Sequence, residues 1–351
     1  MDSNIPTSVK GAPGAGHNVR ASISKEVSTA NPTGVQPRQS NKKFDNCVTK
    51  FAFATKTGYS PKNPNKTNQD SFLVLPHLGE YRRTHFFAVA DGHGVNGKLV
   101  SEFVKSTLAK EVESNIKYTF DQAKINQRVV DSTEVKEQLD KSFHAVTNGL
   151  YKNSGINLRF SGSTCVSVLI VGNKVFCANV GDSRATLARK KEIAGTGQSK
   201  IVGIPLNRDH KADEPDEQAR ILGAGGRVAA YRDMQGNPLG PARVWHLHED
   251  IPGLAMSRSF GDQAAAEVGV NANPEITEMN LVESDKFMIL ASDGVWEFIS
   301  NDQAVNIVLP HYNNNSAEKA AEALIREAMK RWQEEDTSID DITCIIIFLN
   351  I

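Results

Sequence analysis

Cysteine is scarce in this sequence, and its placement excludes several kinds of site. The four cysteines of the 351 residues stand singly and form no Cys-x-x-Cys pair. They are Cys47, Cys165, Cys177 and Cys344. This spacing provides neither a thiolate zinc site nor a dithiol redox motif, and it is typical of buried, reduced thiols.

Net charge and long hydrophobic runs are also lacking. The 40 Lys and Arg nearly balance the 41 Asp and Glu, so we expect neither a nucleic-acid surface nor a polybasic membrane patch. No apolar run approaches the roughly 18–20 residues of a membrane-spanning helix. The first residues lack the apolar stretch of a signal peptide, and Asp2 excludes N-myristoylation. We therefore expect a monomer without a membrane anchor, located in the cytoplasm, the nucleus or both.

The composition changes near residue 44. Residues 1–43 are rich in Ser, Asn, Pro, Gly and Lys and show no hydrophobic period, which predicts a disordered N-terminal tail. From residue 44 onward, apolar runs alternate with polar turns. Although the length suggests two domains, acidic motifs described below extend through this whole part. If these acids meet in one site, residues 44–351 form one domain.

Acidic residues stand repeatedly at the ends of predicted strands. The apolar run Phe86–Ala90 is followed by Asp91-Gly92-His93-Gly94, and Phe287–Ser292 is followed by Asp293-Gly294. Asp70 and Asp340-Asp341 each come directly before a further apolar run. In Gly181-Asp182-Ser183-Arg184 an acid lies between two strand-like runs, which predicts a hairpin with Asp182 at its tip. Asp262, in the segment Ser257–Asp262, is a sixth candidate acid.

The remaining pattern predicts both strands and helices. Strands are expected over Val48–Thr55, Asp70–Leu75, Cys165–Val171, Val175–Val180 and Ile342–Leu349. Helices are expected after Gly97 and over Phe120–Lys152, Asp213–Leu222 and Ala317–Glu334. The apolar stripe of the second helix would include Val129, Val130, Val135, Leu139, Phe143, Val146 and Leu150. Tyr231–Gly253 is polar and is predicted to be an irregular flap.

Crowded carboxylates repel one another unless a cation neutralises them. Few basic residues occur in the same motifs, and oxygen ligands without Cys or paired His select magnesium or manganese. Two such ions about 3.5–4 Å apart activate water against phosphorus. The pattern thus indicates in-line attack by a metal-bridging hydroxide on a phosphomonoester. His93 is the expected donor of a proton to the leaving oxygen, because the ordinary pKa of histidine is near neutral.

These motifs resemble those of a known family, the metal-dependent serine/threonine protein phosphatases of type 2C. The resemblance covers about residues 51–351 and rests on six blocks in the same order and with comparable spacing. The blocks are Asp91-Gly92-His93-Gly94, Ser161–Thr164, Gly181–Arg184, Ser257–Asp262, Ala291–Trp296 and Asp340–Thr343. Six ordered blocks make a chance match improbable, whereas each one alone would be weak.

The resemblance implies a fold and a ligand set. The fold would be an α+β, four-layer αββα sandwich, with two packed antiparallel sheets, helices on both outer faces and the metal site in a cleft at one end. Asp91 would bridge two Mg²⁺ or Mn²⁺ ions, and Gly92 would contribute its carbonyl oxygen. Asp293 and Asp340 would complete the first site, and Asp70 would act on the second metal. Asp182, with Asp293, would help to hold a weaker third ion.

Two departures from the family pattern concern the loop before Asp70. Where the family has a phosphate-binding arginine, this chain has Asn65, so Lys66 is the candidate replacement, although it lacks the two-point contact of a guanidinium. Gln69 stands where an acid is common.

The resemblance implies an active phosphatase of phosphoserine and phosphothreonine in proteins, with residues 44–351 as its catalytic domain. The main alternative is a catalytically silent relative that binds partners as a scaffold, but such a protein would be expected to have lost a metal ligand. An unrelated metal-dependent nuclease would normally show a basic groove, which the balanced charge does not favour.

Overall fold

The computed structural model describes residues 47–152 and 155–351. The predicted tail, residues 1–43, lies outside the described residues. Two five-stranded antiparallel sheets form the centre of the described part. The first contains, in spatial order, β1 (Val48–Lys56), β16 (Ile342–Leu349), β15 (Asp285–Ala291), β8 (Arg184–Glu192) and β9 (Ser199–Pro205). The second contains β14 (Glu275–Asn280), β7 (Lys174–Val180), β6 (Cys165–Val171), β3 (Thr84–Ala90) and β2 (Ser71–Leu75).

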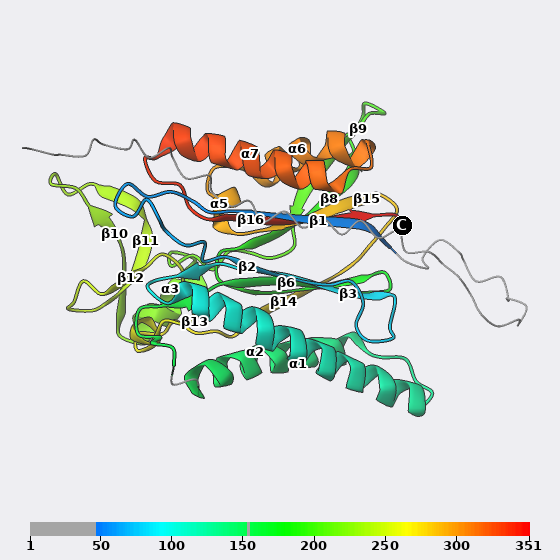
Figure 1. The fold of residues 1–351 in the computed structure, drawn as a ribbon, viewed down its shortest axis with the longest axis horizontal. Coiled ribbons are helices and arrows are strands. Elements are labelled where there is room, and N and C mark those ends of the chain that lie inside the picture. The colour runs from blue at the N-terminus through cyan, green and yellow to red at the C-terminus, as the bar shows by residue number, and fades with distance from the viewer. Residues whose placement is uncertain (1–46, 153–154) are drawn as a thin grey trace, which may run out of the picture.

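Pairs of helices cover the outer faces of both sheets (Figure 1). The long helices α1 (Gly97–Ile125) and α2 (Ser132–Lys152) lie on the second sheet, whereas α6 (Asn301–Asn313) and α7 (Ala317–Glu335) lie on the first. The short helices are α3 (Pro215–Gly223), α4 (Gln263–Ala266) and α5 (Asp293–Trp296). This arrangement confirms the predicted αββα sandwich. Within the described ranges, no helix has the length and apolar character needed to span a membrane.

Strand alternation explains how the four layers are held together. In β3, Phe86 and Ala88 pack with the α1–α2 layer, while Phe87 and Val89 face the other sheet. In β16, Ile346 likewise packs against the α6–α7 layer, while neighbouring side chains lie between the sheets. Because successive side chains of a strand point to opposite faces, a strand covered on both sides must be apolar at almost every position. The continuous apolar runs of the sequence thus correspond to the middle layers of the sandwich.

Two small sheets lie beside the sandwich. The first contains β10 (Gly226–Arg232), β11 (Pro238–His246) and β12 (Pro252–Leu254), and the second contains β4 (Gly92–His93), β5 (Gly162–Ser163) and β13 (Phe260–Gly261). The prediction that Tyr231–Gly253 is irregular was therefore wrong, because most of this segment is antiparallel sheet, whereas its role as a flap stays a prediction. Its polar sequence reflects exposure of the strands. Its own small core includes Ile221 of α3 and Val244 of β11.

Two further predictions need correction. The runs around Asp182 do not form a hairpin, since β7 belongs to one sheet and β8 to the other, so Gly181–Ser183 crosses between the layers. The helix predicted over Phe120–Lys152 is two helices, because α1 continues to Ile125 and α2 begins only at Ser132. Val129 lies in the connection and is 90% exposed. Periodicity alone does not distinguish a helix from a helix joined to a short turn.

Candidate metal centre

Strand pairing brings four of the predicted acids together in two pairs. Ser71 of β2 pairs with Ala90 of β3, which places Asp70 and Asp91 at the same end of the second sheet. In the first sheet, β15 and β16 pair through Ala291 and Cys344, and their adjoining ends carry Asp293 and Asp340. In an antiparallel pair, the end of one strand lies beside the start of its neighbour. Residues far apart in the sequence are thus collected by ordinary sheet pairing.

The two sheets then bring these pairs into electrostatic contact with one another. Burial, followed by the charges of Asp70, Asp293 and Asp340, raises the pKa of Asp91 well above its ordinary value. The direct interaction with the Asp293 side chain raises the pKa of Asp91 further. Burial and the charges of Asp182 and Asp340 raise the pKa of Asp293 in the same direction. All five predicted acids therefore belong to one cluster that has to be neutralised by protons or by cations.

Three carboxylates of this cluster have one oxygen with no hydrogen-bond partner. These oxygens are Oδ1 of Asp70, Oδ1 of Asp182 and Oδ1 of Asp293. Asp70 is 5% exposed and its other oxygen accepts a 2.9 Å hydrogen bond from Ser292. Burial, reinforced by the charge of Asp341, raises the pKa of Asp70 to about 7. Buried oxygens without a donor are costly, so this region of the described structure is suited to a bound cation.

Two lysines already neutralise part of the cluster. Lys211 donates to Asp182 Oδ2 at 2.5 Å, and Lys66 lies 3.4 Å from Asp340 and 3.2 Å from Asp341. The charge of Asp182 raises the pKa of Lys211 despite the opposing effect of burial. The expectation that few basic residues accompany the acids was thus correct for the sequence motifs and wrong for the folded site. The acidic motifs of the sequence did not reveal Lys211, which lies 29 residues after Asp182.

The neighbouring acids Asp340 and Asp341 have different surroundings. The side chain of Asp340 is 46% exposed, whereas that of Asp341 is 4% exposed. Asp341 accepts 2.8 Å hydrogen bonds from the backbone N–H groups of Gly58 and Gln69. It therefore anchors the ends of the loop that carries Lys66. Asp340 is the more exposed member of the pair, and its role as a metal ligand stays a prediction.

His93 is held by the sixth candidate acid. Its Nε2 lies 2.6 Å from Oδ2 of Asp262, which also accepts a 2.6 Å hydrogen bond from Ser259. Burial lowers the pKa of His93, but the charge and hydrogen bond of Asp262 outweigh it and raise the pKa overall. Asp262 is thus a partner of the histidine, a role that its sequence motif did not reveal.

Close backbone packing explains the glycines beside His93. A Cβ atom on Gly92 would lie 2.3 Å from the carbonyl oxygen of Gly97, and one on Gly94 would lie 2.0 Å from that of Phe160. Gly94 also has a φ of 80°, which favours glycine. Gln69 closes the turn by donating to the carbonyl oxygen of Gly94 at 2.7 Å. The role of the Gly92 carbonyl as a metal ligand stays a prediction.

The acids of the cluster are ligands that hard divalent cations prefer, although their side chains do not converge on one position in this structure. Within residues 47–152 and 155–351, no three His, Cys, Asp or Glu side chains converge closely enough to hold an ion. The cluster nevertheless presents only carboxylate oxygens, three of them unpartnered, as Mg²⁺ and Mn²⁺ prefer. Binding of a cation would replace the mutual repulsion of these carboxylates with coordination.

Stacked antiparallel sheets, outer helices and acids at the adjoining strand ends together define the architecture of a metal-dependent protein phosphatase. Comparison with known proteins identifies the family. The family described as "Protein phosphatase 2C" matches residues 60–337. This chain belongs to the protein phosphatase 2C family, whose members are serine/threonine protein phosphatases.

Curated relatives share about a third of their aligned residues with this chain. "Probable protein phosphatase 2C 64" of Oryza sativa subsp. japonica is 34% identical over 298 residues, which cover 84% of this chain and 66% of the relative. "Probable protein phosphatase 2C 73" of Arabidopsis thaliana is 32% identical over 305 residues, or 83% of this chain and 78% of the relative. The family match over residues 60–337 includes Asp70, Asp91, Asp182 and Asp293 and ends before Asp340.

Solved structures confirm the fold at lower sequence identity. A serine-threonine phosphatase 2C from Toxoplasma gondii has a TM-score of 0.70 at 24% identity and covers 87% of this chain and 97% of its own. A C. elegans sex determining protein has a TM-score of 0.64 at 22% identity and covers 88% of this chain and 66% of its own. These likenesses concern the fold alone.

Proposed function

We propose that this chain hydrolyses phosphoserine and phosphothreonine in proteins, with two Mg²⁺ or Mn²⁺ ions as cofactors. The observation that supports this proposal is the cluster of buried carboxylates with unpartnered oxygens at one end of the sandwich. Their raised pKa values mean that the metal-free site retains protons that a cation would displace. Family membership and the chemistry of the donor set support the same reaction.

The proposed ligands follow from position and exposure. Asp91 would contact both ions, because it interacts with acids from both sheets. Asp293 and Asp340 would complete the first site, with Asp70 and the carbonyl oxygen of Gly92 serving the second. When bound, divalent ions neutralise the phosphate charge and activate water for in-line attack on phosphorus. Asp182 would help to hold a weaker third ion, for which it would have to exchange its pairing with Lys211.

The protein's own groups would orient the phosphate and transfer a proton. His93, held through Nε2 by Asp262, is the proposed acid that protonates the leaving serine or threonine oxygen. Its Nδ1 has no hydrogen-bond partner among the described residues, so in the imidazolium form the N–H at this atom is available for donation. An alkoxide is a poor leaving group, and protonation by a positioned acid commonly contributes about 10²–10⁴-fold to such a step.

Lys66 is the proposed anchor for the phosphate. Its ammonium lies beside Asp340 and Asp341, at the edge of the cluster, and its side chain is 19% exposed. Cations that neutralise these acids would leave Lys66 free to contact a phosphate oxygen as a point charge.

We also propose that the protein acts as a monomer in the cytoplasm, the nucleus or both, on phosphoproteins rather than on nucleic acids.

The test is turnover of a phosphothreonine peptide by purified protein with Mn²⁺, with Mg²⁺ and with a chelator. Turnover that requires either metal and disappears with the chelator is the expected result. Circular dichroism of the same samples establishes that the protein is folded. A folded protein without turnover under any metal would overturn the proposal and favour the scaffold alternative, in which the chain binds partners without hydrolysing them.

A further inference from the structure

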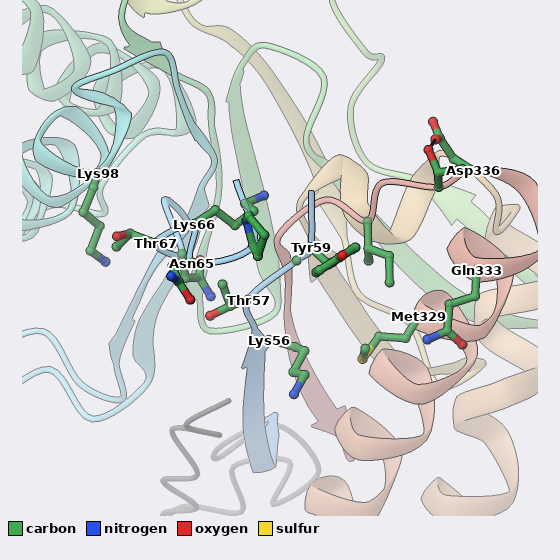
Figure 2. Close-up of a pocket in the computed structure, with 15 residues that line it drawn as sticks. Lys56, Thr57, Tyr59, Asn65, Lys66, Thr67, Lys98, Met329, Gln333 and Asp336 are labelled. Atoms are coloured by element: carbon green, nitrogen blue, oxygen red, sulfur yellow. Dashed lines mark hydrogen bonds between the residues drawn. The ribbon is translucent and has the colours of Figure 1, made fainter. Parts of the chain in front are cut away.

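A large pocket lies directly beside the proposed metal centre, and apart from Lys66 none of its lining residues has a part in the proposed reaction. Its volume is about 1210 Å³, and Lys66 lies in its wall. The rest of its wall comes from β1, from the loop after it, from α1, and from α7 and the segment that follows it (Figure 2). Because the ammonium of Lys66 contacts Asp340 and Asp341, the pocket and the centre share this wall. A chain that reaches the centre can thus extend into the pocket.

Positive charge predominates on the pocket wall. Lys56, Lys66 and Lys98 line it, against the single acid Asp336. In Figure 2, Asp336 lies on the side of α7, away from Lys56 and Lys98. Its carboxylate already accepts a 3.0 Å hydrogen bond from the N–H of Ser338. The part of the pocket nearest β1 and α1 is therefore cationic.

Two of these lysines are available to a ligand. No carboxylate of the described residues lies within ion-pair distance of Lys56, which stands at the end of β1. Lys98 lies 3.3 Å from Glu102, but this is a surface pair between side chains that are 37% and 54% exposed. Such pairs contribute about 0–1 kcal/mol, so an arriving anion can replace Glu102 at little cost. Lys98 also donates to the carbonyl oxygen of Asp70 at 3.4 Å, which places it next to the centre.

The size and lining of the pocket suit a peptide segment. Small-molecule sites usually measure about 300–1,000 Å³, and this pocket is larger. Asn65 and Thr67 add hydrogen-bonding groups, while Tyr59 and Met329 add apolar surface on the opposite side. Mixed polar and apolar walls with two available ammonium groups match an extended segment that carries an anionic side chain.

We propose that this pocket is a substrate subsite that binds a second anionic residue of the phosphoprotein, through Lys56 and Lys98, while the phosphate to be removed occupies the centre. The inference rests on the proposed phosphatase function and deepens it. It makes acidic or multiply phosphorylated segments the preferred substrates. Either a carboxylate or a neighbouring phosphate supplies the anion, since both present oxygens to an ammonium group.

The test compares kcat/KM for one phosphothreonine peptide in four versions, with alanine, lysine, glutamate or phosphoserine at the flanking positions. At low ionic strength we expect the glutamate and phosphoserine peptides to exceed the alanine peptide by ~3- to 10-fold, with the lysine peptide below it. The preference should shrink in 0.5 M salt, because exposed charges are then screened within a few ångströms. The preferred anion is identified by dividing kcat/KM of the phosphoserine peptide and of the glutamate peptide by that of the alanine peptide and comparing the two ratios.

A pair of double variants locates the preference in the pocket. In Lys56→Gln/Lys98→Gln, the ratio of acidic to neutral peptide should fall toward one. The matched control Lys110→Gln/Lys117→Gln removes the same charge from exposed positions of α1 and should keep the wild-type ratio. Because the readout is a ratio within each variant, a general loss of activity does not affect it.

The possible failures are distinguishable. Turnover of all four peptides at equal rates would overturn this inference and leave the phosphatase function intact. An equal fall of the ratio in both double variants would overturn the assignment to the pocket, since only net charge would then matter. No turnover of any peptide would overturn the proposed function, and this inference with it.

Discussion

His93 and Asp262 are 169 residues apart in the sequence, yet Nε2 of the imidazole lies 2.6 Å from Oδ2 of the carboxylate. Asp262 is buried, its φ of 42° is unusual for a residue other than glycine, and Ser259 donates to the same oxygen. Such a backbone conformation costs free energy and persists only where its surroundings impose it. The segment Ser257–Asp262 thus fixes the orientation of the histidine.

Asp262→Asn should slow hydrolysis of a phosphothreonine peptide by roughly 10-fold, because a misoriented acid transfers its proton less readily. His93→Ala should cost roughly 100-fold or more on the same substrate. Both variants should affect an aryl phosphate much less, since a phenolate leaves without protonation. Equal losses on the two substrates would exclude His93 as the acid.

Gly162→Ala should reproduce the effect of Asp262→Asn without changing His93 or Asp262. A Cβ atom at Gly162 would lie 2.0 Å from Oδ2 of Asp262 and would displace that carboxylate from His93. Gly223→Ala is the matched control, because nothing lies within 4 Å of its Cβ position. The prediction concerns the ratio of phosphopeptide to aryl phosphate turnover, which should fall only in Gly162→Ala. An unchanged ratio in a folded Gly162→Ala protein would contradict it.

Asp91→Asn should abolish turnover with Mg²⁺ or Mn²⁺ while leaving the metal-free fold at least as stable, because it removes a charge from a repelling cluster. Thermal unfolding gives a second readout. Mn²⁺ should raise the wild-type midpoint, as any ligand of the native state does, but it should raise that of Asp91→Asn far less. Glu113→Gln, an exposed position on α1, is the control and should respond like the wild type. An equal metal-induced shift in Asp91→Asn would remove this residue from the ligand set.

Lys211→Gln should destabilise the metal-free protein, because it leaves the buried Asp182 without its cation. Breaking one partner of a fully buried pair costs about 3–5 kcal/mol, and the 31% exposure of Lys211 reduces the expected cost to about 2 kcal/mol. Urea unfolding in the presence of a chelator measures this difference. Adding Asp182→Asn to the same variant should restore most of the loss. If the double variant is as unstable as the single one, the ion pair is not the cause.

Acid should destabilise the fold partly through His85. Burial lowers the pKa of this histidine to about 4, and its Nδ1–H donates to the carbonyl oxygen of Pro76 at 2.6 Å. The unfolded chain, with an ordinary pKa near 6.5, binds the proton more readily, so the free energy of unfolding decreases as the pH falls from about 6.5 to 4. The decrease from this residue approaches about 3 kcal/mol at the lower limit.

The contribution of His85 is measured by urea unfolding across that pH range. His85→Gln should show a shallower pH dependence than the wild type, whereas His248→Gln, at an exposed position, should not. Parallel pH profiles for the wild type and His85→Gln would show that another group is responsible.

The fold was predictable because its signals are local. The continuous apolar runs that became β3, β6, β15 and β16 are required wherever a strand is covered on both faces, and the amphipathic pattern of α7 is equally direct. The crossover at Gly181–Ser183 was predicted as a hairpin. Two strands joined by a short turn have the same sequence pattern whether they pair in one sheet or belong to two. Only the packing of two sheets decides between these arrangements.

The candidate site divides in a similar way. Asp70, Asp91, Asp182, Asp293 and Asp340 were identified from sequence because each adjoins a strong strand signal, and the strand ends are brought together by pairing and packing. Their roles as ligands stay predictions. The partners of these acids and of His93 were not visible, because Lys211, Ser292 and Asp262 contact residues from distant segments.

By itself, the sequence determined the middle strands, the amphipathic helix α7 and the position of an acid at each of five strand ends, since backbone periodicity and burial act over a few neighbouring residues. The tertiary structure alone decided which charges meet. It paired Lys66 with Asp340 and Asp341, joined His93 to Asp262, and left a cationic pocket open beside the centre. The physical reason is range: secondary structure follows from local sterics and hydrogen bonds, whereas Coulomb interactions depend on distances that only the packed layers set.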